Sequence, residues 1–154
     1  MLLDMIALSI HLIAATLWVG GIFLVYQVFR PAAMSLEPPI RLPLFLNIFT
    51  RFFPWVWAFI VMLVVSGYWI WMTRFTEAEI IPIHLHAMHL IGWLMIVLFS
   101  WLYFKPFSDL KQAIANQAYP EAGKIINTRM KPIIIINLIL GLLEAVIGAT
   151  GTYW

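Results

Sequence analysis

The chain has 154 residues, of which 64% are hydrophobic and only 10% carry a charge. Soluble domains are about 25% charged, so this composition excludes the ordinary soluble classes and indicates an integral membrane protein. The sequence contains no cysteine, which excludes disulfides, thiolate metal sites and covalent attachment of a c-type haem.

Four apolar segments each supply the roughly 20 residues of helix that cross a bilayer. They comprise residues 5–29, 53–73, 83–104 and 132–151. Lipid does not tolerate unpaired backbone groups, and no segment shows the alternation of a barrel strand, so each is predicted to be a helix. We therefore expect an all-α fold, with residues 1–154 forming one integral membrane four-helix bundle.

The first segment has no basic region before its apolar core and is longer than the core of a signal peptide, so we expect it to be retained as a helix. Pro38, Pro39 and Pro43 predict breaks in the loop that follows it. Residues 107–130 predict a solvated helical connector that is interrupted near Pro120.

Basic residues indicate the orientation in the membrane, because they are retained preferentially on the cytoplasmic side. Only Arg74 lies in the loop after the second segment, beside Glu77 and Glu79. The other eight of the nine lie in the loops after the first and third segments: Arg30, Arg41, Arg51, Lys105, Lys111, Lys124, Arg129 and Lys131. Both termini are therefore predicted to face the outer, periplasmic side. The basic charge reports this orientation, and we predict no nucleic-acid partner from it.

Ionisable side chains gather near the outer boundary of the predicted bundle. At 1.5 Å per residue, His11 and His89 each lie about 9 Å below that boundary and His86 about 5 Å below it. Glu144, the only acid inside a segment, lies about 10 Å below the same surface. An ionisable residue inside a membrane costs about 3 kcal/mol, so four in one layer predict a common purpose.

Imidazole is the usual protein ligand of haem iron and also suits copper and zinc. His86 and His89 project from one face of a helix, so they cannot reach opposite sides of one porphyrin. A six-coordinate haem would pair His89 with His11 on a facing helix, and His86 would replace His89 or bind a second haem. His84 lies about 160° around the helix from His86 and is expected to hydrogen-bond at the interface instead.

Other residues at this level suit a bound porphyrin. Arg74 would pair with haem propionates in two-pronged fashion, although a snorkelling arginine beside Glu77 and Glu79 explains it equally well. Small residues let either a flat ring or a neighbouring helix come close: Gly20 and Gly21, which follow Trp18, and Gly141 and Gly148 in the fourth segment.

The chain resembles the CopD-like (copper resistance D-like) integral membrane proteins over nearly its whole length, in IHLIAATLWVGGIFLVYQVFRPA, RFFPWVWAFIVMLVVSGYW, HLHAMHLIGWLMIVLFSWLYFKPF and INLILGLLEAVIGATGTYW. The first histidine followed by Trp-Val-Gly-Gly is the most specific part of this resemblance. The group is also similar in size and helix number to HemJ-type membrane haem proteins. The resemblance implies a four-helix inner-membrane protein in which His11 and the histidines of the third segment bind b-type haem or copper.

These observations predict a b-type haem protein of the bacterial inner membrane, serving electron transfer or a haem-linked redox step near the periplasmic face. An enzymatic version would be a membrane haem oxidoreductase. Its expected partners are the lipid bilayer, a quinone or periplasmic redox partner, and a second copy of the chain. The expected site comprises His11 and His89 as axial ligands, His86 as a ligand or its support, Arg74 on the propionates, Trp18 beside the cofactor, and Glu144 in proton coupling.

Two alternatives remain open. Imidazole and thioether suit copper in its two oxidation states, so His84, His86, His89 and Met88 could form an outward copper-capture site for uptake or tolerance. The histidines could otherwise bridge helices in a structural subunit of a larger membrane complex.

Overall fold

The computed structural model describes residues 1–75 and 81–153, and every regular element within them is helical. The elements are α1 Leu2–Phe23, η1 Leu24–Phe29, α2 Arg30–Ala33, α3 Pro38–Arg74, α4 Ile83–Phe104, α5 Pro106–Ala115, α6 Tyr119–Ile125, η2 Ile126–Met130, α7 Lys131–Thr150 and η3 Gly151–Tyr153. The predicted all-α class is confirmed.

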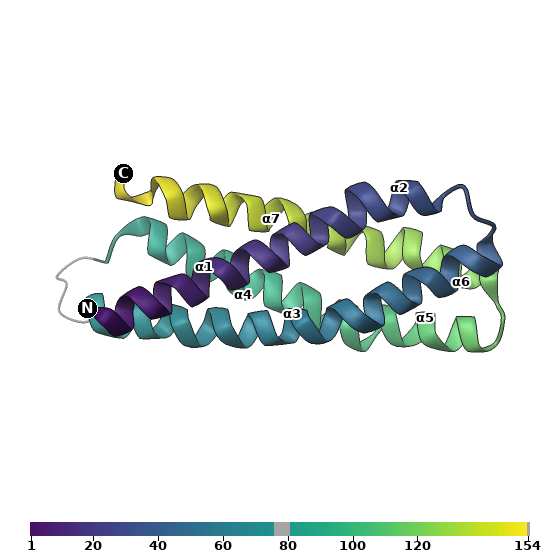
Figure 1. Cartoon of the computed structure of the whole chain (residues 1–154), viewed down its shortest axis with the longest axis horizontal. Helices are drawn as coiled ribbons and strands as arrows, with labels where there is room; N and C mark the ends of the chain where they lie inside the picture. Colours follow the sequence, from purple (N-terminus) through teal and green to yellow (C-terminus); the bar gives the residue numbers. More distant parts are fainter. Residues whose placement is uncertain (76–80, 154) are drawn as a thin grey trace.

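These elements join into four rods that lie side by side along the long axis of the molecule (Figure 1). Each rod is long and apolar enough to cross a membrane: Leu2–Ala33, Pro38–Arg74, Ile83–Ala115 and Tyr119–Thr150. The four predicted membrane helices are therefore confirmed. We call the end with the N-terminus and Ile83 the histidine end, and the end with α2, α5 and α6 the basic end. The prediction that the histidine end faces the periplasm stays a prediction.

The second rod begins earlier than the sequence suggested. Pro38 and Pro39 open α3 instead of breaking a loop, because the first turn of a helix has no partner for the N–H groups that proline lacks. Pro43 and Pro54 lie inside the helix, which continues through both. With 37 residues, α3 is about 55 Å long, so part of it extends beyond a hydrocarbon core of about 30 Å.

Two short π-helical stretches, η1 and η2, interrupt the first and fourth rods near the basic end. Each is followed by a basic residue and then a proline, Arg30-Pro31 after η1 and Lys131-Pro132 after η2. A proline cannot donate to the carbonyl four residues earlier, and at these two places the helix hydrogen-bond pattern changes just before it. The Arg30 N–H bonds to the Val25 carbonyl and the Lys131 N–H to the Ile126 carbonyl, five residues back in both cases.

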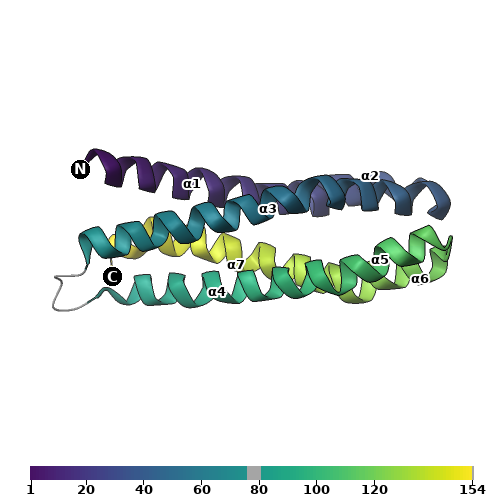
Figure 2. The same cartoon turned by 90° about the horizontal axis from the view of Figure 1, so that it is seen from below.

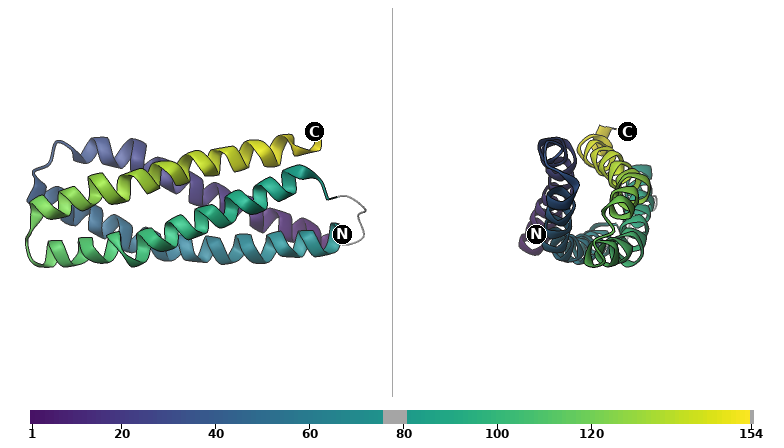
Figure 3. Two further views of the ribbon diagram at one scale, coloured as in Figure 1. Left: turned by 180° about the vertical axis from the view of Figure 1, so that it is seen from behind. Right: turned by 90° about the vertical axis from the view of Figure 1, so that its right-hand side faces the viewer.

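The rods are arranged as two packed pairs. α1 packs on α3, α4 packs on α7, and α1 also contacts α7 (Figure 2). Seen end-on, the helices form an arc whose two tips are α2 and α7 (Figure 3). The centre of the core is aromatic: Phe53 meets Phe99 and Phe107 edge to face, at ring-centroid distances of 5.4 and 4.8 Å. This aromatic centre separates the histidine end from the basic end.

Candidate functional site

His86 and His89 lie together on the face of α4 that meets α3. The ring centroid of Trp71 on α3 is 5.7 Å from those of both imidazoles, so the indole lies beside the pair. Tyr68 is one turn earlier on α3, and its hydroxyl lies 3.4 Å from Nε2 of His89. Both histidines are exposed on the isolated bundle. The structure therefore places two adjacent imidazoles on the surface of the bundle, next to aromatic side chains of α3.

His11 approaches α3 from the opposite partner helix, α1. Its Nδ1 lies 2.9 Å from Oγ of Ser66, which is buried. The Ser66 hydroxyl donates its own proton to the Met62 carbonyl, which leaves its oxygen free to accept from Nδ1 of His11 when that nitrogen carries the proton. In this tautomer the neutral imidazole keeps a lone pair on Nε2, the arrangement in which a histidine can ligate a metal.

Gly67 makes room for this imidazole. A Cβ built on Gly67 would lie 3.3 Å from Cε1 of His11, tighter than an ordinary side-chain contact. The sequence carried a usable signal for this contact. Ser66 and Gly67 are small residues about 10 Å from the outer end of the second predicted segment, which is the depth estimated for His11.

A different set of side chains lines the contact between α4 and α7. We call it the α4–α7 seam and define it by His84, Met88 and Gly92 on α4, Glu144 and Gly148 on α7, and Gly151 at the start of η3. A Cβ built on Gly148 would lie 3.2 Å from Cε of Met88, and one built on Gly151 would lie 2.5 Å from Cδ2 of His84. His84 and Met88 therefore face α7, whereas His86 and His89 face α3.

Glu144 belongs to this seam, one turn further into the bundle than Gly148. Its half-buried carboxyl lies against the backbone of Gly92, and Oε1 has no hydrogen-bond partner among the described residues. An intramembrane carboxyl group is costly, so it commonly marks a functional position. The structure places Glu144 in the same seam as Met88.

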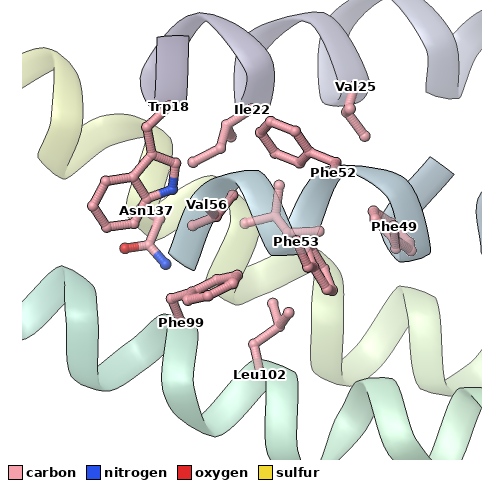
Figure 4. A pocket seen from close by; sticks show the side chains of 11 residues that line it. Trp18, Ile22, Val25, Phe49, Phe52, Phe53, Val56, Phe99, Leu102 and Asn137 are labelled. Carbon is pink, nitrogen blue, oxygen red and sulfur yellow. The ribbon is translucent and has the colours of Figure 1, made fainter. Parts of the chain in front are cut away.

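Trp18 lies deeper than the histidines, in the aromatic core. Its indole meets Phe99 edge to face at a centroid distance of 6.3 Å, and only 3% of the residue is exposed. Figure 4 shows it beside Asn137, on the wall of a small apolar cavity. Asn137 is also 3% exposed, and its Oδ1 has no partner among the described residues. The predicted contact of Trp18 with a cofactor stays a prediction.

Arg74 is the last residue of α3 and is exposed at the histidine end. Its predicted neighbours Glu77 and Glu79 lie outside the described residues, and its predicted contact with propionates stays a prediction. No three His, Cys, Asp or Glu side chains in the described ranges come close enough to hold one metal ion. The predicted ligands thus lie in three places. His86 and His89 form a pair, His11 lies apart from them on α1, and Glu144 lies in the α4–α7 seam.

Sequence reasoning missed the aromatic neighbours of the pair. Tyr68 and Trp71 are three positions apart and so share one face of α3. Aromatic residues near the end of a membrane helix are ordinarily interpreted as an interfacial belt. The spacing alone was available as a signal, but it could not show that this face meets α4.

Comparison with protein families gives a match over most of the chain. The model of the family CopD, copper resistance protein D, matches residues 46–151, which is more than half of the chain. The match covers most of α3 and all of the third and fourth rods, whereas His11 lies before it. No curated protein and no solved structure gives a significant match. The chain therefore belongs to the CopD family of copper resistance protein D.

Proposed function

We propose that this chain binds copper at the histidine end, as a membrane protein of copper uptake or tolerance, and that His86 and His89 are its first ligands. The observation that carries the proposal is the placement of two adjacent, exposed imidazoles on one face of α4, inside the segment that matches the copper resistance family. Copper is here a cargo, and exposed ligands near one end of the bundle suit its capture.

The chemistry of the donors fits copper. Neutral imidazole binds copper through a ring nitrogen, and two imidazoles three residues apart on a helix project in nearly the same direction. Tyr68 lies at hydrogen-bond distance from one of them and can orient its ring. His84 and Met88 present a further imidazole and a soft thioether to α7 within the same two turns. These suit reduced copper as the next point of contact.

The haem reading has less support. The family description concerns copper, and b-type haem, with the quinone or periplasmic redox partner it implies, has no support from the family match. His11 and His89 contact α3 through different neighbours, Ser66 for His11 and Tyr68 for His89. The inner-membrane location and the formation of oligomers stay proposals beside the established multi-pass architecture.

The proposal can be tested with the purified protein in detergent. We expect it to bind one Cu(I) per chain under ascorbate, measured by competition with a coloured Cu(I) chelator, and to show no Soret absorbance as isolated. Bound copper next to Trp71 should quench tryptophan emission. Trp71→Phe should therefore lose a large part of the copper-dependent quenching while it keeps the stoichiometry.

Trp55→Phe is the matched control. Trp55 is an exposed residue of α3 that lies nearer its N-terminus than Trp71, and it contacts Phe59 instead of a histidine. Its quenching should equal that of the wild type. Failure of the wild-type protein to compete for Cu(I) would reject copper binding. If the wild-type protein showed a Soret band that disappeared in His11→Ala and His89→Ala, the proposal of copper binding would be replaced by one of haem binding.

A further inference from the structure

A groove at the basic end lies where the first and fourth rods diverge, far from the histidines. We call it the basic groove. Its apolar floor is formed by Val25, Phe45, Phe49, Ile126 and Ile134, and its rim carries Arg30 and Lys131. Tyr26 completes the lining, below the Arg30 guanidinium, whose Cζ is 5.9 Å from the ring centroid. The groove therefore combines an apolar floor with two cations.

The two π-helical stretches border this groove from both sides. η1 supplies Val25 and ends next to Arg30, while η2 supplies Ile126 and ends next to Lys131. One hydrogen bond links the two sides, from Nη2 of Arg30 to Oδ1 of Asn127 at 3.2 Å. π-Helical turns are rare and frequently occur at functional sites. The altered helix geometry places both basic residues at the rim of one groove.

Arg30 and Lys131 are the charged residues in the lining of the basic groove. Within residues 1–75 and 81–153, neither side chain forms an ion pair with a carboxylate at salt-bridge distance. Asp109 at the same end is already engaged by Arg129 at 2.6 Å and by Lys105 at 3.4 Å. The rim thus offers positive charge to an external anion.

We propose that the basic groove binds one anionic phospholipid, with the phosphate between Arg30 and Lys131 and an acyl chain along the apolar floor. Both cations stand where a predicted membrane segment ends or begins, so they lie at the level of lipid phosphates. An apolar groove at that level is exposed to lipid chains, and basic pockets between membrane helices bind anionic head groups. A neutral lipid could fill the floor equally well, and the two cations select a negatively charged head group.

Native mass spectrometry of the full chain, released from detergent after incubation with defined lipids, tests this site. The wild-type protein should retain phosphatidylglycerol in preference to phosphatidylcholine. A basic side chain at an anionic surface contributes about fivefold to binding, so Arg30→Gln with Lys131→Gln should reduce the preference by about 25-fold. Arg30→Lys, which keeps the charge but changes the contact with Asn127, should keep most of it.

The matched control is Lys111→Gln with Lys124→Gln, which removes the same charge from two exposed positions at the same end. This variant should bind phosphatidylglycerol like the wild type. Equal losses in both double variants would overturn the proposal in favour of diffuse surface charge. An unchanged preference in the Arg30/Lys131 variant would also overturn it, as would displacement of the lipid by millimolar inorganic phosphate or a dimer that excludes lipid.

Discussion

Replacing both His86 and His89 by alanine should weaken Cu(I) binding by at least about a hundredfold, because loss of even an indirect partner of a metal ligand typically costs 10- to 100-fold. This expectation rests on the copper-binding proposal. Both imidazoles are exposed beside Trp71, so their removal should leave the helical content unchanged. The measurement is competition with a Cu(I) chelator in detergent, with circular dichroism as the check of the fold.

The control variant removes the candidate metal-donor side chains on the other face of α4. His84→Ala with Met88→Leu removes one imidazole and one thioether from the seam with α7, within the same two turns of helix. If copper first binds on the α3 face, this variant should lose clearly less affinity than the His86/His89 variant, because it leaves both proposed first ligands in place. The comparison therefore separates two faces that differ by about 160° on one helix.

The reverse result would place the copper site on the other face of α4. A hundredfold loss in the His84/Met88 variant, with the His86/His89 variant unchanged, would place copper in the seam beside Glu144. In that case Glu144→Gln should also weaken binding, because it removes the only carboxylate of the seam. Unchanged affinity in both double variants would contradict ligation by the α4 histidines altogether, although other residues could still bind copper.

Much of the architecture could be predicted from the sequence because lipid leaves the chain few choices. The apolar segments had to become helices, and four of them appeared at the predicted places. The bounds at the basic end could not be predicted so well. Proline is a helix breaker in general, yet Pro38 and Pro39 open α3, and Pro31 and Pro132 follow stretches of π-helix. Whether proline starts, alters or ends a helix depends on hydrogen bonds that neighbouring turns can offer.

The candidate site could be predicted only in part. Helical periodicity correctly separated the face of His86 and His89 from that of His84. Depth counting put His11 and His89 at one level, and both do meet α3 within about one helical turn, at Ser66 and Tyr68. Periodicity does not specify which neighbouring helix each face meets. The packing between helices, including the close contacts at glycines, decides which helix each face meets. Counting residues along one helix gives no information about that packing.

Gly141→Ala should lower the free energy of unfolding by about 1 to 3 kcal/mol, the usual cost of overpacking a well-packed core. Gly141 is buried where α7 meets both α1 and α4. A Cβ at this position would lie 2.5 Å from Cγ2 of Val19 and 3.3 Å from Cε of Met95. The flexible methionine can move, but a valine in a helix has one strongly preferred rotamer. The new methyl group must therefore push α1 away from α7.

Gly92 offers the matched control, because a Cβ built there meets no side chain within 4 Å although it also lies in a membrane helix. Gly92→Ala should be neutral or stabilise by up to about 1 kcal/mol, since alanine favours helix more than glycine. Unfolding in mixed micelles by increasing sodium dodecyl sulfate, followed by circular dichroism, measures both variants. Equal stability of the two would contradict close packing at Gly141.

A second substitution isolates the contact with Val19. If the Gly141 methyl group is costly because it meets Val19, then Val19→Ala should recover most of the loss when it is combined with Gly141→Ala. Alone, Val19→Ala removes packing and should destabilise the bundle, so the two changes should be strongly non-additive. Additive effects would instead show that α1 and α7 do not meet through these two residues, and would require a different crossing of the helices that position His11 and Glu144.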